Sequence, residues 1–462
     1  MSREQADITI VGLGPGPARH WTGAAQIALE GATVLFVRAH PGMDLGDLTG
    51  RQGVIDIEPL CQPDAAAGGR WRAAVLAVCD AAERHPVVLS IPGHPRFGEG
   101  LVLGTLAEAA RRGLTTRVLD GISVVDLIAT ALGVDPLLEG VQCFTGRQVL
   151  AEIPEEPFAG GAFSGSPHRP LLFTHMYEAE TMSGVARLLG RILPPDHPVT
   201  RIEAAGMPEE RISQHTLSGL ACVEAGPLVA LWVPAQAELE ATRDPRTLQH
   251  IVARLREPDG CPWDREQTHQ SLRDAIIDEA YEVTDAIDSG DPDNLAEELG
   301  DLLLLITMHA QIASEAGTFA IEDVQESIAT KIIGRHPHVF GDDIVESEAD
   351  LHRIWREAKA RERAARPGKG GLKDLDGEPR SMPALTRATR VLRDRPLVPD
   401  TASSTPEQRA DRLLRAIAEV VAAGDDPDAV LRARLIQHAT GGADPGRVAR
   451  DPASEPSDVS GE

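Results

Sequence analysis

The chain has 462 residues, of which 42% are hydrophobic, and this is enough for two or three domains that each bury a core. Its 45 Lys and Arg against 71 Asp and Glu give a formal net charge of −26, which argues against duplex nucleic acid and anionic membrane surfaces as main partners. We expect metal cations or a small cation-bound ligand instead.

The cysteines and the N-terminus indicate the compartment. The five cysteines are scattered without a C-x-x-C pair, which argues against a disulfide framework and against a cysteine zinc site. The first residues, "MSREQADITIVG", lack the apolar region of a signal peptide, and no run of about 18 apolar residues indicates a membrane span. The sequence therefore predicts a soluble, cytoplasmic protein with no nucleic-acid partner and no membrane partner.

The first region, residues 1–234, alternates short β-branched runs with Ala- and Leu-rich stretches. Segments such as "DITIVG", "TVLFVR" and "PVVLSIPG" indicate strands, and "GLVLGTLAEAARRG" indicates a helix. This alternation predicts an α/β domain with a mostly parallel sheet. The Pro-, Gly- and Ser-rich stretch 152–170 is interpreted as a bridge between two α/β lobes.

A glycine turn, "VGLGPGP", directly follows the first strand and contains Gly12, Gly14 and Gly16. Such a turn lets the backbone approach a ligand closely, although these glycines fit equally well a role in the turn alone. A dinucleotide fingerprint is excluded, because the third glycine of G-x-G-x-x-G would fall on Pro17 and no acidic residue ends the second strand.

Two further segments, 91–100 and 120–133, are expected as loops at the carboxyl ends of strands, where open α/β sheets bind ligands. With "VGLGPG", "PGHP", "GISVVD", "LLFTHMYEAETM" and "VTRIEAAGMPEE", residues 7–234 resemble the tetrapyrrole methylases. That family has two lobes and binds S-adenosylmethionine in the cleft between them. The resemblance implies a cofactor cleft lined by Gly12, Gly14, Gly16, Gly93, Ser123 and Val124.

One position departs from the methylase pattern. His94 stands where many members of that family have Asp, which bears on methyl transfer more than on the fold. Arg38 and Arg96 could meet substrate carboxylates, with ordinary surface arginines as the alternative.

The second region contains an acidic segment that is patterned as a helix pair. From Asp274 to Asp301 there are eleven Asp or Glu and no Lys or Arg, yet apolar residues recur at helical spacing. Glu279 and Glu282 are three residues apart, as are Glu298 and Asp301, so each pair shares one helix face. "SGDPDN" between them supplies a stop and a cap, and predicts a helical hairpin.

A hairpin of this kind would bring four carboxylates together. Without Lys or Arg they would repel by several kcal/mol unless a cation neutralises them. Oxygen ligands alone select a hard ion, so we expect Mg²⁺ or Mn²⁺. The alternative is a solvated acidic helix face, and this is the interpretation adopted for Asp285, Asp288 and Glu297.

Residues 246–363, which contain this acidic segment and the sequence on either side of it, closely resemble the MazG family of nucleoside triphosphate pyrophosphohydrolases. The matching segments are "LREPDGCPWDREQTHQSLRDAIIDEAYEVTDAI", "LAEELGDLLLLITMHAQIASEAGTF", "KIIGRHPHVFGD" and "WREAKARER". The family pattern, E-E-x-x-E followed by E-x-x-D, implies catalytic metal ligands at Glu279, Glu282, Glu298 and Asp301, and implies a homodimer. Asp278 departs from the pattern and is expected to be a supporting residue or a weakened ligand.

Other candidate residues follow from the same region. Lys331 and Arg335 are one helical turn apart and are candidates for phosphate contacts, with surface ion pairs as the alternative. Trp263 could stack a base, or anchor the first turn as a buried ring. His336 and His338 are interpreted as structural or substrate-edge residues rather than ligands.

The predicted architecture is an α/β two-lobed methylase-like domain followed by an all-α MazG-like domain. The segments are a first domain at 1–234, a linker at 235–247, a helical domain at 248–365, a linker at 366–381, a degenerate second helical repeat at 382–438 and a disordered tail at 439–462. In that repeat Asp411 aligns with Asp301 but no E-x-x-E precedes it, and an unrelated helical extension is the alternative.

Two functions compete. The first is metal-dependent hydrolysis of nucleoside triphosphates to monophosphate and pyrophosphate by the helical domain. The second is S-adenosylmethionine-dependent methylation of a tetrapyrrole-like substrate, with the helical domain as a dimerisation or regulatory module. A third possibility makes the α/β region a ligand sensor that transfers nothing.

Overall fold

The computed structural model describes residues 6–39, 43, 45, 48, 51–61, 71–154, 163–365, 386 and 405–431. The chain divides into two compact units, residues 1–321 and 322–462. The predicted linker 366–381, the predicted tail 439–462 and, within the predicted repeat, residues 382–385, 387–404 and 432–438 lie outside the described residues.

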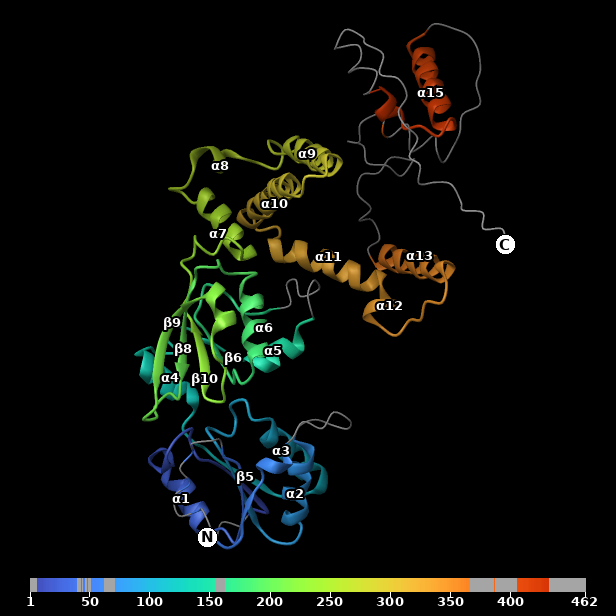
Figure 1. The fold of residues 1–462 in the computed structure, drawn as a ribbon. Coiled ribbons are helices and arrows are strands. Elements are labelled where there is room, and N and C mark those ends of the chain that lie inside the picture. The colour runs from blue at the N-terminus through green and yellow to red at the C-terminus, as the bar shows by residue number, and fades with distance from the viewer. Residues whose placement is uncertain are drawn as a thin grey trace, which may run out of the picture. The chain divides into compact units, whose positions relative to one another are not determined.

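The first lobe is built on a five-stranded sheet in the order β3-β2-β4-β1-β5, with every pairing parallel. Figure 1 draws this lobe in blue, with α1, α2 and α3 labelled. Its strands are β1 (Ile8–Gly12), β2 (Val34–Val37), β3 (Val54–Asp56), β4 (Val87–Ile91) and β5 (Thr116–Leu119). Its helices are α1 (Gly23–Glu30), α2 (Arg72–Ala82) and α3 (Gly100–Arg112), with 3₁₀ turns at Ala18–His20 and Glu58–Leu60.

Burial on both faces explains the apolar runs of this sheet. Ile8 and Ile10 of β1 pack with α2 and α3, whereas Val11 packs with α1 on the opposite face. The prediction of a parallel α/β sheet is confirmed for this lobe.

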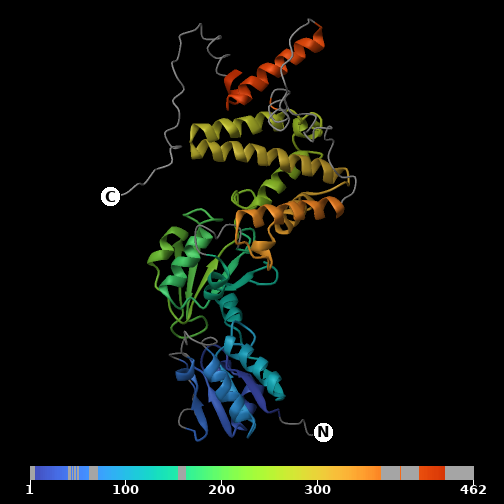
Figure 2. The same cartoon turned by 90° about the vertical axis from the view of Figure 1, so that its right-hand side faces the viewer.

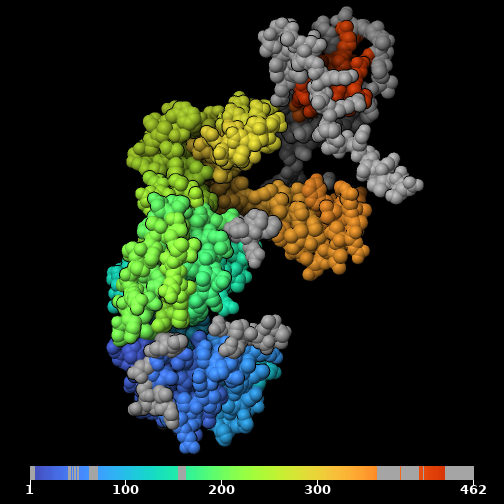
Figure 3. Space-filling model, in the orientation of Figure 1, coloured from blue at the N-terminus to red at the C-terminus, as the bar shows by residue number. Residues whose placement is uncertain are grey.

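The second lobe has a five-stranded sheet in the order β6-β7-β10-β8-β9. Its strands are β6 (Gln142–Thr145), β7 (Leu171–Thr174), β8 (Pro198–Glu203), β9 (Arg211–Thr216) and β10 (Val229–Val233). Its helices are α4 (Val124–Leu132), α5 (Gly146–Glu152) and α6 (Ala179–Leu189), with a 3₁₀ helix at Leu217–Cys222. Figure 3 shows the two lobes with their side chains, blue for the first and green for the second.

Three expectations for this region are corrected. Only β6 and β7 pair in parallel, so a mostly parallel sheet is wrong for the second lobe. The stretch 152–170 is not a bridge between lobes, because β6 before it and β7 after it are neighbours in one sheet. Parallel neighbours need a crossover, and α5 is part of it; residues 155–162 of the stretch lie outside the described residues. The expected loop 120–133 is mostly α4, whose Ile128 packs in the second lobe.

The predicted linker 235–247 is packed rather than a free connection. Ala241, Asp244 and Thr247 are buried, and the Thr247 hydroxyl donates to the Ala241 carbonyl oxygen at 2.7 Å. The Asp244 carboxylate accepts from the Arg246 backbone N–H and caps α7 (Pro245–Arg256), so the helix begins inside the expected linker. The following short helix is α8 (Pro262–Glu266).

The helical hairpin forms as the sequence predicts, with α9 (Ala275–Ser289) packed along α10 (Pro292–Glu315) (Figure 2). Gly290 ends α9 with a φ of 69°, in the left-handed region that glycine adopts without strain. The Asp291 carboxylate accepts from two backbone N–H groups of the first turn of α10, and Pro292 occupies that turn.

The remaining described helices are α11 (Ile321–Arg335), α12 (Pro337–Phe340), α13 (Glu348–Ala365) and α15 (Pro406–Ala422). The short helix α12 lies within the segment "KIIGRHPHVFGD" that carries part of the family resemblance. Among the described residues, no helix combines the length and the apolar run needed to cross a bilayer.

Candidate functional site

The hairpin brings three predicted ligands together. Glu279 and Glu282 on α9 and Glu298 on α10 each offer a carboxylate oxygen, and these oxygens all lie within 4.8 Å of one another. The Glu282 carboxylate lies close enough to Glu298 to raise the pKa of that group. Two carboxylates this close hold either a proton or a cation between them.

The electrostatics of this carboxylate cluster follow from its crowding. Desolvation, and then the charges of Glu282, Asp301 and Asp278, raise the pKa of Glu279. Desolvation, and then Glu282, raise the pKa of Glu298. Asp301 and Asp278 are thus close enough to act on the cluster, although Asp301 is not among the three whose oxygens converge.

The cluster fits a hard cation. One carboxylate oxygen of Glu279, Oε2, is buried and has no hydrogen-bond partner among the described residues. No ion pair to Glu279, Glu282, Glu298 or Asp301 occurs in the described part of the chain, so no Lys or Arg neutralises them there. An all-oxygen donor set with an unpartnered buried oxygen suits Mg²⁺ or Mn²⁺, and the assignment of these ligands stays a prediction.

The predicted substrate residues lie on other helices. Lys331 and Arg335 are on α11, one turn apart and half-buried. Trp263 is on α8 with 65% of its surface exposed, so its ring is not a buried anchor. The Arg256 guanidinium, with only 6% of its side chain exposed, pairs with Glu315 and donates to backbone carbonyls of α8 and the residue after it, which fixes the short helix in place.

A pair of histidines joins α10 to the segment before α9. The Nδ1 atoms of His269 and His309 lie 2.8 Å apart and the rings are stacked with 2° between their planes. Two ring nitrogens at this distance can share only one proton. Burial, and then His269, lower the pKa of His309.

We expect the His269–His309 pair to make the folded chain less stable at acidic pH. The pKa of His309 is lower in the folded chain than its value of 6.5 in the unfolded chain, so the unfolded chain takes up the proton at a higher pH. The contribution of His309 to stability is therefore complete above pH 6.5 and is lost as the pH falls below that value. The test is urea unfolding of the full chain at pH 8 and pH 5.5. The free energy of unfolding should fall less between these pH values for His309→Gln than for the unchanged protein. The exposed His85→Gln is the control, and an unchanged loss in His309→Gln would contradict the assignment.

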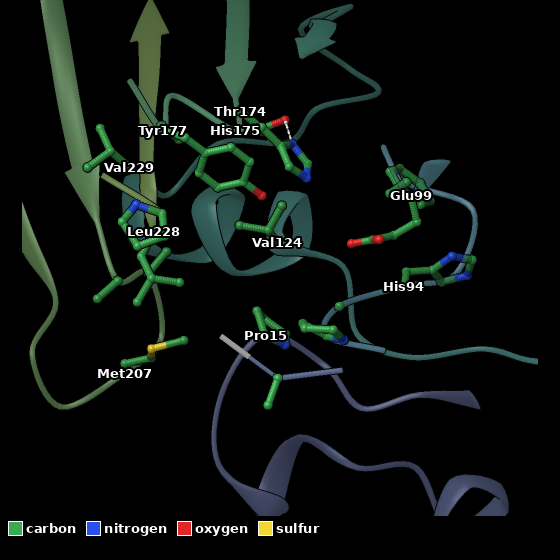
Figure 4. A pocket seen from close by; sticks show the side chains of 18 of the residues that line it. Pro15, His94, Glu99, Val124, Thr174, His175, Tyr177, Met207, Leu228 and Val229 are labelled. Carbon is green, nitrogen blue, oxygen red and sulfur yellow. Dashed lines mark hydrogen bonds between the residues drawn. The ribbon is translucent and has the colours of Figure 1, made fainter. Parts of the chain in front are cut away.

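The two lobes enclose a cavity of about 400 Å³, here called the apolar cavity (Figure 4). Second-lobe residues form much of its wall, among them Ala204, Ala205, Met207, Leu228, Val229 and Ala230. Polar groups enter it from Glu99, His175 and Tyr177, and the Glu99 carboxylate points into the space. An apolar wall with a few convergent polar groups is typical of a small-molecule site.

The predicted cofactor residues are only partly in this cavity. Gly93 and Val124 line it, whereas the other four do not: Gly12, Gly14, Gly16 and Ser123. Ser123 is buried and caps α4 in a reciprocal capping box with Asp126. The role of all six in cofactor binding stays a prediction.

Close packing inside the chain accounts for the glycine turn. A Cβ on Gly12 would lie 2.7 Å from the Gly93 carbonyl oxygen, and Gly14 has a φ of 68° and exchanges backbone hydrogen bonds with Gly93. A Cβ on Gly14 or Gly16 would approach His20 to 2.8 Å or less. The turn therefore needs glycine for its own backbone, the alternative that the sequence left open.

A second cavity of about 460 Å³, here called the arginine cavity, adjoins the first. Its wall includes Arg38, Arg96, Arg147 and Trp71. Arg38 is largely buried, pairs with Glu99 at 2.7 Å and Glu58 at 3.2 Å, and lies over the Trp71 ring. Burial raises the pKa of Glu99, and the Arg38 charge partly offsets this effect.

The sequence did not single out Glu99, His175 or Tyr177 as site residues. Glu99 follows the loop after β4, while His175 and Tyr177 follow the end of β7. Their position after strand ends is a usable signal, but it depends on knowing which strands neighbour each other. His94 also lines the apolar cavity, 3.6 Å from Asp120, and Arg96 lines the arginine cavity.

Known protein families match both the first and the second region of the chain. The family profile described as tetrapyrrole (corrin/porphyrin) methylases matches residues 7–221, and that of the MazG nucleotide pyrophosphohydrolase domain matches residues 267–340. A solved structure, the uroporphyrin III C-methyl transferase of Thermus thermophilus, is 20% identical with a TM-score of 0.35, covering 49% of this chain and 91% of that one.

Two relatives cover different lengths of the chain. The nucleoside triphosphate pyrophosphohydrolase/pyrophosphatase MazG of Thermotoga maritima is 44% identical over 146 residues, which is 31% of this chain and 53% of that protein. The uncharacterized protein YabN of Bacillus subtilis is 32% identical over 387 residues, which is 83% of this chain and 76% of that protein. The chain therefore belongs to the YabN-like family, in which a tetrapyrrole methylase domain precedes a MazG nucleotide pyrophosphohydrolase domain.

Proposed function

We propose that the chain hydrolyses nucleoside triphosphates to monophosphate and pyrophosphate, using Mg²⁺ or Mn²⁺ held by Glu279, Glu282, Glu298 and Asp301. The observation that supports this most directly is the convergence of three carboxylates within 4.8 Å, with no ion pair to them among the described residues. The MazG profile over residues 267–340 and the 44% identity to a protein named as a nucleoside triphosphate pyrophosphohydrolase agree with it.

The residues have separate tasks in this proposal. A bound cation would neutralise the phosphates and lower the pKa of an attacking water. The carboxylates on α9 and α10 hold that charge in one place, since the hairpin fixes the spacing of both helices. Lys331 and Arg335 would contact phosphate oxygens, and the exposed Trp263 ring would stack on the base.

A nucleotide screen tests the proposed reaction. The full chain is incubated with each common nucleoside triphosphate, with and without Mg²⁺, and pyrophosphate release is measured separately from phosphate release. Metal-dependent release of pyrophosphate and monophosphate is expected. Release of phosphate alone, or equal release in EDTA, would contradict cleavage between the α and β phosphates.

We also propose that the apolar cavity binds S-adenosylmethionine, the second candidate function being methyl transfer. The apolar wall suits a planar base, and the polar groups beside it suit the charged part of such a molecule. The methylase profile over residues 7–221 agrees with this role. Calorimetry with S-adenosylhomocysteine tests it, and absence of heat from binding would exclude the cavity as this site.

We expect the chain to form a homodimer through the helical hairpin. Leu299, Leu303 and Ile306 lie on one face of α10 and remain 41–49% exposed, which leaves an apolar stripe that a second helix pair would cover. Light scattering at micromolar concentration should give a dimer, and Leu303→Glu should shift it to monomer. Asp288→Asn, on the exposed surface of α9, is the control, and a monomeric unchanged protein would contradict the prediction.

A further inference from the structure

His175 lies at the junction of the two cavities in the methylase-like domain. It follows the last residue of β7 and lines both the apolar cavity and the arginine cavity. The other residues shared by the two walls are Arg38, Glu99 and Tyr177. The His175 ring therefore borders both spaces; Figure 4 shows it on the side of the apolar cavity, with its contact to Thr174.

The backbone turns His175 toward these cavities. Leu171 and Phe173 face the core beneath α6, and every second residue of a regular strand lies on one side, so residue 175 would be expected in that core as well. The backbone instead places Met176 in the core, so the regular alternation ends at this point. His175 has a φ of 60°, which is uncommon for a residue other than glycine. Such a conformation is unfavourable for a residue with a Cβ, and the core packing of Met176 holds it in place.

Hydrogen bonding determines which ring nitrogen carries the proton. The Thr174 hydroxyl donates to the Phe144 carbonyl oxygen at 3.3 Å, and its oxygen lies 2.9 Å from Nδ1 of His175. The carbonyl oxygen can only accept, so the tautomer that satisfies both contacts has Nδ1–H as the donor in the second one. In that tautomer Nε2 carries the lone pair, and the described residues supply no hydrogen-bond donor to it.

The surroundings keep the imidazole neutral and reachable. Burial, and then the charge of Arg38, lower the pKa of His175. Gly98, with a φ of 73°, leaves the ring edge open, because a Cβ there would lie 2.7 Å from Cε1 of His175. The other titratable groups on the two walls are Glu58, Glu99, Tyr177, His94, Arg96 and Arg147. The imidazole is therefore neutral near pH 7 with Nε2 open to a proton donor, while the same burial and Arg38 charge make it a weaker base than a free imidazole.

We propose that Nε2 of His175 accepts the proton released by a methyl acceptor, and that the acceptor is an anion with an O–H or N–H nucleophile bound in the arginine cavity. The inference rests on the proposed S-adenosylmethionine site in the apolar cavity. The acceptor's oxygen or nitrogen forms a bond to the methyl carbon, and the sulfur–carbon bond breaks with its electron pair left on sulfur. The acceptor's proton passes to Nε2, which leaves the imidazole positively charged.

The arginine cavity supplies the preference for an anion. Arg38, Arg96 and Arg147 line it against one carboxylate, Glu99, in a chain whose net charge is −26. Arg38 is paired with Glu99 and Arg147 with Glu178, whereas Arg96 has no ion pair among the described residues. Arg96 is therefore the guanidinium that an acceptor's charge would meet first.

Nuclear magnetic resonance of the full chain labelled with ¹⁵N in its histidine rings tests the proton position. We expect the His175 signals, identified by their loss in His175→Gln, to report Nδ1–H and an unprotonated Nε2 at pH 7. Thr174→Val should raise the fraction with a proton on Nε2, while Thr174→Ser should retain the original form. A proton on Nε2 in the unchanged protein, or a doubly protonated ring at pH 7, would overturn the proposal.

A chromophoric anion tests proton transfer itself. The probe is 4-hydroxy-3-nitrobenzoate, which carries a carboxylate and a phenol that turns yellow on ionisation. At a pH where the free probe is mostly protonated, the full chain should bind it and raise its phenolate absorbance, and His175→Gln should abolish the rise. Arg96→Gln should weaken binding about tenfold, the scale of one charged hydrogen bond.

The outcomes separate the two proposals. Equal absorbance in His175→Gln, or no binding of the probe by calorimetry, overturns the role of His175 and of the arginine cavity. Failure of the unchanged chain to bind S-adenosylhomocysteine, with the predicted His175 tautomer intact, removes the methyl-donor site and leaves the proton assignment standing.

Discussion

Glu282→Gln is expected to lower pyrophosphate release by about 10² or more, while the metal-free protein becomes more stable. The loss of rate follows the scale seen when one charge-stabilising group is removed from an active site. The gain in stability has a separate cause, because Glu282 is the neighbouring charge that most raises the pKa of both Glu279 and Glu298. Both effects are measured on one preparation, by a pyrophosphate assay and by thermal melts in EDTA.

The opposite signs separate a metal site from an acidic surface. Asp288→Asn removes one negative charge from an exposed position of the same helix and should change neither the rate nor the metal-free melt appreciably. If Glu282→Gln behaves like Asp288→Asn in both measurements, the three carboxylates are a solvated helix face, and the proposed hydrolysis loses its support. Asp301→Asn is a second test, since Asp301 contributes to the raised pKa of Glu279.

Adding Mg²⁺ to the metal-free protein is expected to stabilise the helical hairpin by about 2.7 kcal/mol at a free concentration 100 times its Kd. The energy comes from binding to the folded carboxylate cluster, which the unfolded chain does not assemble. The shift should shrink as the pH falls toward the raised pKa values of Glu279 and Glu298, because protons then occupy the oxygens that hold the cation.

Thermal melts in EDTA, in Mg²⁺ and in Mn²⁺, each at two pH values, measure the stabilisation by the cation and its dependence on pH. The Glu282→Gln protein is the matched variant and should respond less to Mg²⁺, while Asp288→Asn should respond as the unchanged protein does. A melt of the unchanged protein that no divalent cation moves would contradict the metal assignment. A shift of equal size at both pH values would place the cation away from Glu279 and Glu298.

The sequence predicted most of the hairpin, because its determinants are local. Gly290 ends one helix and Asp291 caps the next, and both act on backbone groups within a few residues of themselves. The three-residue spacing of Glu279 and Glu282 fixes their shared face once a helix forms. The position of Glu298 opposite them follows from the short turn, which leaves the two helices little choice but to pack antiparallel.

The sequence by itself thus determined the two hairpin helices, the capped turn between them, the parallel first sheet and the family. The tertiary structure decided where the lobes divide, that residues 124–132 form a helix, and which residues face the cavities. Strand neighbours such as β6 and β7 pair across a long intervening segment, so no local pattern reveals that the strands before and after 152–170 belong to one sheet. The requirement for glycine in the turn follows from its close contacts with Gly93 and His20, which only the folded chain shows. The contacts of the His175 ring depend on Thr174, whose hydroxyl meets a carbonyl from β6, and on Met176, which takes the core position. Only folding brings these groups together.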